Sequence, residues 1–183
     1  MQHIMGRPNT VSPRQVMSPR FTHYAKQVKK NCHAMAEALV SKGYTLATGG
    51  TDNHLILWDL KPQDISGNKF ETLADLCNIT VNKNAINGDT SAFTPGGVRV
   101  GTPALTSRGL NEEHFVTVAH FLSRVVEICV AAQKTAGNKK MVDFEKVISE
   151  DATTKASIAA LRAEVEAFAT QFPMPGVSLP PKA

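Results

Sequence analysis

Aromatic side chains are scarce in this chain of 183 residues, where they make up 6% of the sequence. Surfaces that bind single-stranded nucleic acids combine basic side chains with aromatic rings that stack on the bases. Lysine and arginine outnumber acidic residues, which gives a formal net charge of +4. Basic charge without a supply of aromatic rings does not favour a nucleic-acid partner.

Acidic residues are missing from the start of the chain, and the first of them is Glu37. An acid-free, arginine-bearing start is typical of a remnant of an organelle-targeting segment, and it would also suit polyanionic ligands. Residues 1–15 contain two prolines and no sustained period, so we expect a loose arm there. Residues 16–176 are then expected to form one domain, followed by a proline-rich tail at 177–183.

The three cysteines lie far apart and form no CxxC pair, and no run of about 18 apolar residues is present. This spacing argues against a zinc site or a disulfide framework and favours buried, reduced thiols. We therefore expect an intracellular protein that does not span a membrane. Cytoplasmic and mitochondrial locations are not separated by this argument.

Apolar residues recur at three- and four-residue steps in several stretches, which predicts amphipathic helices. Ser18-Pro19 begins the first such stretch and Gly43 ends it, while Asn111 begins the longest, which ends at Gly137. Shorter helices are predicted over Lys69–Cys77, around Phe144–Ile148 and from Ile158 to Phe172. Strands are predicted at 44–47, 55–60 and 79–81, and residues 82–84 are predicted to form a loop.

The most informative stretch is TPGGVRVGTPALTSRG at 94–109. If Val98–Val100 is a strand, the two valines share one face and Arg99 lies on the other. A guanidinium held in this way suits a carboxylate, because it can donate two parallel hydrogen bonds to the same planar anion. A surface ion pair beside a turn is the alternative explanation for Arg99.

Three segments together resemble serine hydroxymethyltransferases: VRVGTPALTSRG at 98–109, TGGTDNHLILWDL at 48–60 and TVNKN at 80–84. The tail FPMPG at 172–176 is similar to that family's ending. The resemblance runs in collinear order over residues 16–176 and covers only the C-terminal part of the family's chain. It implies an α/β fold (an α+β sandwich), namely the small domain of a fold-type I pyridoxal-phosphate enzyme, with a short mixed or antiparallel sheet covered by helices.

The family moves a one-carbon unit from serine to tetrahydrofolate and leaves glycine, with pyridoxal phosphate as the electron sink. The resemblance implies that Arg99 grips the substrate carboxylate and that Asn84 contacts the folate pteridine. It places Ser91, Ala92 and Phe93 along the folate site and gives Arg108 a supporting role close by.

The sequence also departs from the family pattern. Ala85-Ile86-Asn87 stands where a proline is usual, and Trp58 replaces a smaller aliphatic residue. The family's Schiff-base lysine follows a Thr-His pair, whereas Thr153-Thr154-Lys155 lacks the histidine and reads as a helix start. No catalytic residue or metal ligand is therefore assigned, and the isolated chain is expected to be inactive.

Two roles remain open from the sequence. The chain is either the C-terminal domain of such an enzyme, which needs the missing large domain, or a non-catalytic product that binds the full-length enzyme. Either role leaves an apolar surface without its usual cover, so we expect self-association into a homo-oligomer.

Overall fold

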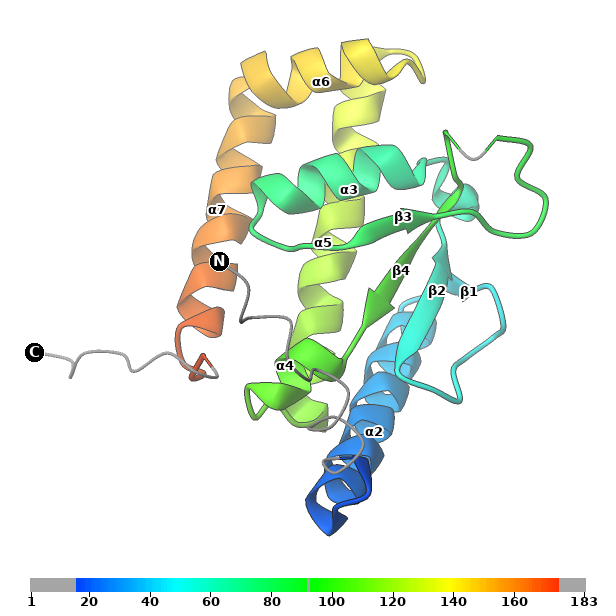
Figure 1. The fold of residues 1–183 in the computed structure, drawn as a ribbon. Coiled ribbons are helices and arrows are strands. Elements are labelled where there is room, and N and C mark those ends of the chain that lie inside the picture. The colour runs from blue at the N-terminus through cyan, green and yellow to red at the C-terminus, as the bar shows by residue number, and fades with distance from the viewer. Residues whose placement is uncertain (1–15, 92, 175–183) are drawn as a thin grey trace, which may run out of the picture.

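The computed structural model describes residues 16–91 and 93–174 and shows six α-helices with a four-stranded antiparallel sheet in that part of the chain (Figure 1). The helices are α2 (Pro19–Ser41), α3 (Gly67–Leu76), α4 (Pro103–Ser107), α5 (Glu112–Ala136), α6 (Met141–Glu150) and α7 (Ala152–Ala169). The strands are β1 (Thr45–Leu46), β2 (Leu55–Asp59), β3 (Asn82–Asn84) and β4 (Gly97–Gly101), and a 3₁₀ turn, η1, covers Lys61–Gln63. The predicted α+β class, with a short antiparallel sheet and helices over it, is confirmed.

Helix termini follow the capping chemistry of the sequence. The Ser18 hydroxyl accepts a hydrogen bond from the Phe21 amide, and Asn111 forms a capping box with His114 at the start of α5. Gly43 and Gly137, which follow the predicted helices, both have positive φ angles. The predicted arm at 1–15 and the tail at 177–183 lie outside the described residues.

One strand prediction is wrong. Residues 79–81 form no strand, and the sheet is built instead by Asn82–Asn84, the segment expected to be a loop. These three residues pair antiparallel with β4, opposite Gly97–Arg99. Pairing with a central strand therefore overrides the low strand preference of asparagine and lysine.

Strand β4 lies between β2 and β3 in the sheet, whose order is β1-β2-β4-β3. Its two faces differ, as the alternation in the sequence predicts. Val98 is buried and opposes buried Trp58, while exposed Arg99 opposes Leu57. Lys83 opposes Val98 and pairs with Glu71 of α3, so α3 lies on the valine face of the sheet.

Helix α5 is the centre of the helical layer and packs against α2, α3, α6 and α7. It is long and apolar enough to cross a membrane by length and composition, and 44% of its most apolar window is buried inside the fold. A buried core helix of this composition has its apolar face covered by protein. The expectation that the chain does not span a membrane stays a prediction.

The three cysteines are free and buried, as expected. Burial raises the pKa of the Cys77 thiol to about 11, and burial also raises the pKa values of Cys32 and Cys129. Such thiols stay protonated at neutral pH and are poor nucleophiles.

A close approach between Gly67 and Gly97 fixes α3 on the sheet. The Gly67 amide donates to the Pro95 carbonyl at 2.7 Å, and a Cβ atom on Gly67 would lie 2.3 Å from the Gly97 carbonyl oxygen. No side chain larger than hydrogen fits there without backbone movement, so the first turn of α3 depends on glycine.

We predict that Gly67→Ala lowers the free energy of unfolding by about 1–3 kcal/mol, because the added methyl group forces the helix off the strand. Urea unfolding followed by the fluorescence of Trp58, the single tryptophan, measures this. Gly50→Ala is the matched control, since nothing lies within 4 Å of its Cβ position and its φ angle is not positive. Equal stability of the two variants would contradict the predicted contact.

Candidate functional site

The candidate site lies on the face of the sheet opposite Val98, where Arg99 projects from β4. Among residues 16–91 and 93–174, the side chain of Arg99 has no hydrogen-bond partner and no ion pair, and the residue is exposed. The surface ion pair considered as an alternative is therefore absent within that range. An arginine with all five donors unused is available to an incoming planar anion.

Asn82 is the direct neighbour of Arg99 and lies opposite it in β3. Residues paired in this way have Cβ atoms about 5 Å apart, so the two side chains can reach one ligand. Asn84 lies on the same face at the diagonal position, because it pairs with Gly97. The sheet thus places the predicted residues Arg99 and Asn84 on one face, together with Asn82, which the sequence predicts to lie in a loop.

The side chain of Asn84 is turned toward its own backbone. Its Nδ2 donates to the Ala85 carbonyl at 2.7 Å. This is a local hydrogen bond of the kind asparagine makes in turns, and its amide oxygen stays available as an acceptor. A ligand that also offers acceptors would have to compete with that bond.

A hollow of about 870 Å³ adjoins this face. Its walls are formed by Leu55 and Leu57 of β2, by α2 residues such as His33 and Val40, and by the turn at Thr48–Asn53. Leu57 is the residue directly opposite Arg99 on the β2 side. The hollow therefore borders the strand next to Arg99, and Leu57 is the lining residue that pairs with Arg99.

The loop between β3 and β4 is organised by Asp89. One carboxylate oxygen accepts hydrogen bonds from the Ile86 amide at 2.9 Å and from the Gly96 amide at 2.8 Å, and Lys61 lies 3.6 Å from the other oxygen. Desolvation opposes ionisation, but the two amides and Lys61 outweigh it, so the pKa of Asp89 lies below its ordinary value.

Two of the predicted folate-site residues lie on this loop. The Ser91 hydroxyl accepts a hydrogen bond from the Phe93 amide, and Phe93 is 88% exposed with its carbonyl held by Asn68. Ala92 lies outside the described residues. An aromatic ring that is almost fully exposed buries little apolar area in this chain alone and is free to pack against another molecule.

The unusual Ala85-Ile86-Asn87 segment has a structural explanation. Ile86 is buried, and its Cγ2 atom would lie 2.7 Å from a Cβ on Gly97. Ile86 thus covers the start of β4 in the space that the absent Gly97 side chain leaves. The turn predicted at Asn87-Gly88-Asp89 is confirmed by the hydrogen bond from the Asp89 amide to the Ile86 carbonyl.

Arg108 is separated from Arg99 by the sheet. Its Nε donates to the Pro173 carbonyl, and its Nη2 donates to the carbonyls of Ala169 and Phe172 at the end of α7. It lines a cavity together with Val100, whose side chain lies on the opposite side of β4 from Arg99. The structure does not bring the two predicted arginines together.

Lys155 lies in the first turn of α7, which Asp151 caps by accepting from the Thr154 amide and hydroxyl. Of the strand residues that the structure describes, Lys83 is the one lysine, and it lies on the helix-covered face. No group of three His, Cys, Asp or Glu residues in the described part of the chain could hold a metal ion.

Comparison with known proteins decides the family. The family described as serine hydroxymethyltransferase matches residues 1–122. This chain belongs to the serine hydroxymethyltransferase family. It is 51% identical over 166 residues to serine hydroxymethyltransferase 5 of Arabidopsis thaliana, covering 91% of this chain and 34% of that protein.

Other relatives give the same picture. The chain is 46% identical to the chloroplastic serine hydroxymethyltransferase 3 of Arabidopsis thaliana over 90% of its own length and 31% of that protein. It is 45% identical to the cytosolic serine hydroxymethyltransferase of Oryctolagus cuniculus over 91% of its own length and 35% of that protein. The chain therefore spans about a third of the length of these serine hydroxymethyltransferases.

We predict that Asp89→Asn accelerates hydrogen exchange at the amides of Ile86 and Gly96 by about tenfold, because a charged acceptor is lost from both bonds. In the unchanged protein the carboxylate stabilises the loop above the ordinary aspartate pKa of about 3.9. That stabilisation disappears as the pH falls through the lower pKa of the folded state.

Hydrogen exchange followed by NMR between neutral and acidic pH measures both effects. Asp75→Asn is the control, since Asp75 is an exposed helical aspartate. Loop amides that exchange at the same rate in both variants would show that Asp89 does not hold the loop.

Proposed function

We propose that this chain is the C-terminal domain of a serine hydroxymethyltransferase, which transfers a one-carbon unit between serine and tetrahydrofolate. The observation that carries the proposal is Arg99, an exposed residue whose guanidinium has no partner among the described residues and whose strand neighbour Leu57 lines a hollow. In this role Arg99 binds the carboxylate of the amino-acid substrate through two parallel hydrogen bonds.

The folate side of the proposed site consists of Asn84 and the loop residues Ser91, Ala92 and Phe93. Asn84 shares the outward face with Arg99, and the exposed Phe93 ring offers a surface on which a heteroaromatic ring can pack. Asn82, directly opposite Arg99, is the further side chain that we place at this site.

The helix-side position of Arg108 argues against direct contact with the substrate, and we propose that it supports the domain by holding the end of α7.

The proposed partner of the outward face is the part of serine hydroxymethyltransferases that this chain does not span, about two thirds of their length. Pyridoxal phosphate supplies the electron sink of the family's chemistry, and the strand residues around Arg99 do not offer a lysine that could hold it. We therefore propose that the isolated chain is inactive. It contributes one end of a substrate site that is completed elsewhere.

A fusion tests the role of Arg99. The upstream two thirds of the Arabidopsis thaliana serine hydroxymethyltransferase 5 would be joined to residues 16–183 of this chain. We predict that Arg99→Ala lowers kcat/KM for serine at least about 100-fold, because two charge-assisted hydrogen bonds of about 1.5–3 kcal/mol each are lost.

Arg162→Ala is the matched control for this loss, since Arg162 makes an exposed ion pair with Glu166 on α7. It should leave kcat/KM within about twofold, as expected for an exposed pair. An Arg99→Ala fusion as active as the control would refute the assignment of Arg99.

A second candidate role, a binding partner of full-length enzyme, is favoured by the same unpartnered face. For either role we predict that the isolated 183-residue chain shows no turnover of serine. We also predict that it self-associates, because Phe93 and Val40 are exposed and Leu57 is only half-buried. Static light scattering and an assay of serine cleavage measure this. A clean, active monomer would contradict both statements, and dose-dependent inhibition of a full-length relative would support the binding role.

A further inference from the structure

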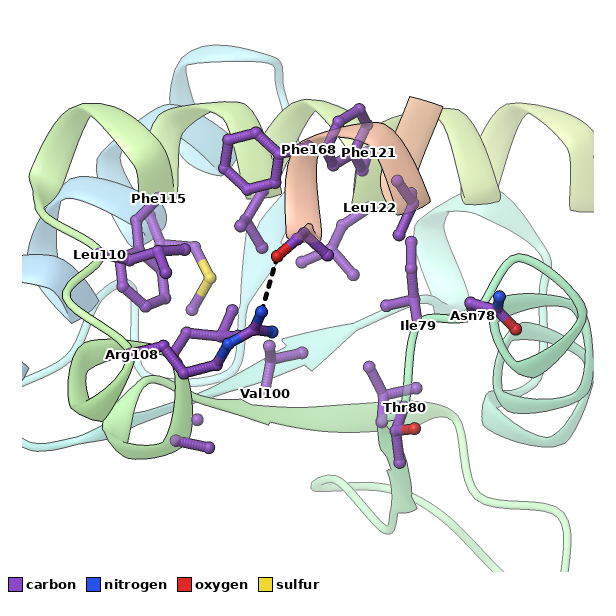
Figure 2. A pocket seen from close by; sticks show the side chains of 18 of the residues that line it. Asn78, Ile79, Thr80, Val100, Arg108, Leu110, Phe115, Phe121, Leu122 and Phe168 are labelled. Atoms are coloured by element: carbon purple, nitrogen blue, oxygen red, sulfur yellow. Dashed lines mark hydrogen bonds between the residues drawn. The ribbon is translucent and has the colours of Figure 1, made fainter. Parts of the chain in front are cut away.

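A second cavity lies on the opposite side of the sheet, between β4 and helices α5 and α7. It has a volume of about 340 Å³ and takes its walls mainly from apolar side chains. Figure 2 shows Arg108 reaching in at one end, Asn78 and Thr80 at the other, and Phe121, Leu122 and Phe168 between them. None of these residues was assigned to the proposed substrate site except Arg108, whose position here is separate from it.

The size of this cavity sets it apart from an ordinary packing defect. Protein interiors are close-packed and contain few voids larger than a water molecule. An engineered apolar cavity of about 150 Å³ already admits benzene, whereas ligand pockets begin near 300 Å³ and are mostly apolar with a few polar groups. This cavity matches the second description, and half-buried lining residues such as Val118, Phe121 and Phe168 give it an opening to solvent.

Arg108 gives the cavity its chemical character. Its Nε and Nη2 atoms are used by the three carbonyls at the end of α7, while Nη1 has no hydrogen-bond partner among residues 16–91 and 93–174. The guanidinium also has no carboxylate within ion-pair distance in that range. The negative end of the α7 dipole offsets part of the charge, and the remaining positive charge suits a carboxylate.

We propose that this cavity binds a small amphipathic carboxylate, with its carboxylate on Nη1 of Arg108 and its apolar body against Phe121, Leu122 and Phe168. The ligand would be an aliphatic or an aromatic monocarboxylic acid. It would lie between Val100 of β4 and Ala169, whose carbonyl Arg108 binds at the end of α7. The site is independent of the one proposed for the amino-acid substrate, because the sheet lies between them.

Titration of the 183-residue chain with octanoate and with 3-phenylpropanoate tests the proposal and distinguishes the two ligand types. Calorimetry should show saturable binding to one site for at least one of them. The neutral probe octanol should bind at least about tenfold more weakly, because it cannot use the charge of Arg108. Intermolecular NOEs should connect the bound acid to Phe121 and Leu122.

Two variants locate the site without relying on Arg108 alone. Val118→Phe fills the cavity and leaves Arg108 in place, so it should abolish binding of the acid. Val116→Phe is the control: it changes the same helix at an exposed position outside the lining and should leave binding unchanged. Arg108→Met should weaken octanoate binding about tenfold or more while leaving octanol unchanged, provided that its unfolding curve shows a folded protein.

Four results would overturn the proposal. These are no saturable binding, equal affinity for octanoate and octanol, unchanged binding to Val118→Phe, and binding that appears only in a chain shortened after Met174. The last result would mean that residues 175–183 compete for the cavity, so that it serves the chain's own tail.

Discussion

The alternation of side chains along β4 is the constraint on which this domain depends. β4 pairs on both sides, with β2 and with β3, so each of its residues is committed to one of two faces. Val98 joins Trp58 in the core, where Trp58 also contacts Tyr44 and Phe70 with ring centroids 4.8 and 5.4 Å away. Arg99 is thereby directed to the face that helix α3 does not cover. A register shift of one residue would bury the guanidinium and expose the valine.

The two glycines of the approach between α3 and β4 make this arrangement possible. Gly67 lets the first turn of α3 contact the Gly97 carbonyl, and Gly97 lets Ile86 cover the strand. The loop from β3 to β4 is then closed by Asp89, which binds amides at both of its ends. Packing on the helix side of the sheet therefore shapes the loop that borders the proposed ligand face. The helix-covered face is mainly apolar and the outward face carries Arg99, but the β3–β4 loop contacts residues that pack on both faces.

Local signals in the sequence predicted most helices because capping is a local interaction. Ser18 and Asn111 cap the helices that they were expected to cap. No helix was predicted over the five residues of α4, which begins at Pro103 directly after β4. The exchange of residues 79–81 for 82–84 as the third strand has a different cause. Strand pairing is decided by a partner distant in sequence. The apolar side chains of Ile79 and Val81 are half-buried and buried in the segment that connects α3 to β3, without being in a strand.

In the candidate site, too, the features set by local sequence were predictable and those set by long-range pairing were not. Period two placed Arg99 outward without any knowledge of the fold. The neighbouring Asn82 could not be found, because its place opposite Arg99 depends on the register between β3 and β4. The position of Arg108 was equally hidden, since the carbonyls that it binds lie more than 60 residues further along the chain. Long-range packing gave Arg108 a role on the far side of the sheet that no local motif indicates.

The central claim is that the outward side of β4 is a carboxylate-binding surface. A crystal structure of the fusion with the upstream part of the Arabidopsis relative, grown with glycine, tests it most directly. The account predicts that both oxygens of the glycine carboxylate lie within hydrogen-bonding distance of the Arg99 guanidinium, with Asn82 close by. A glycine carboxylate held by other residues, with Arg99 turned to solvent or paired with an acidic side chain of the upstream part, would contradict it.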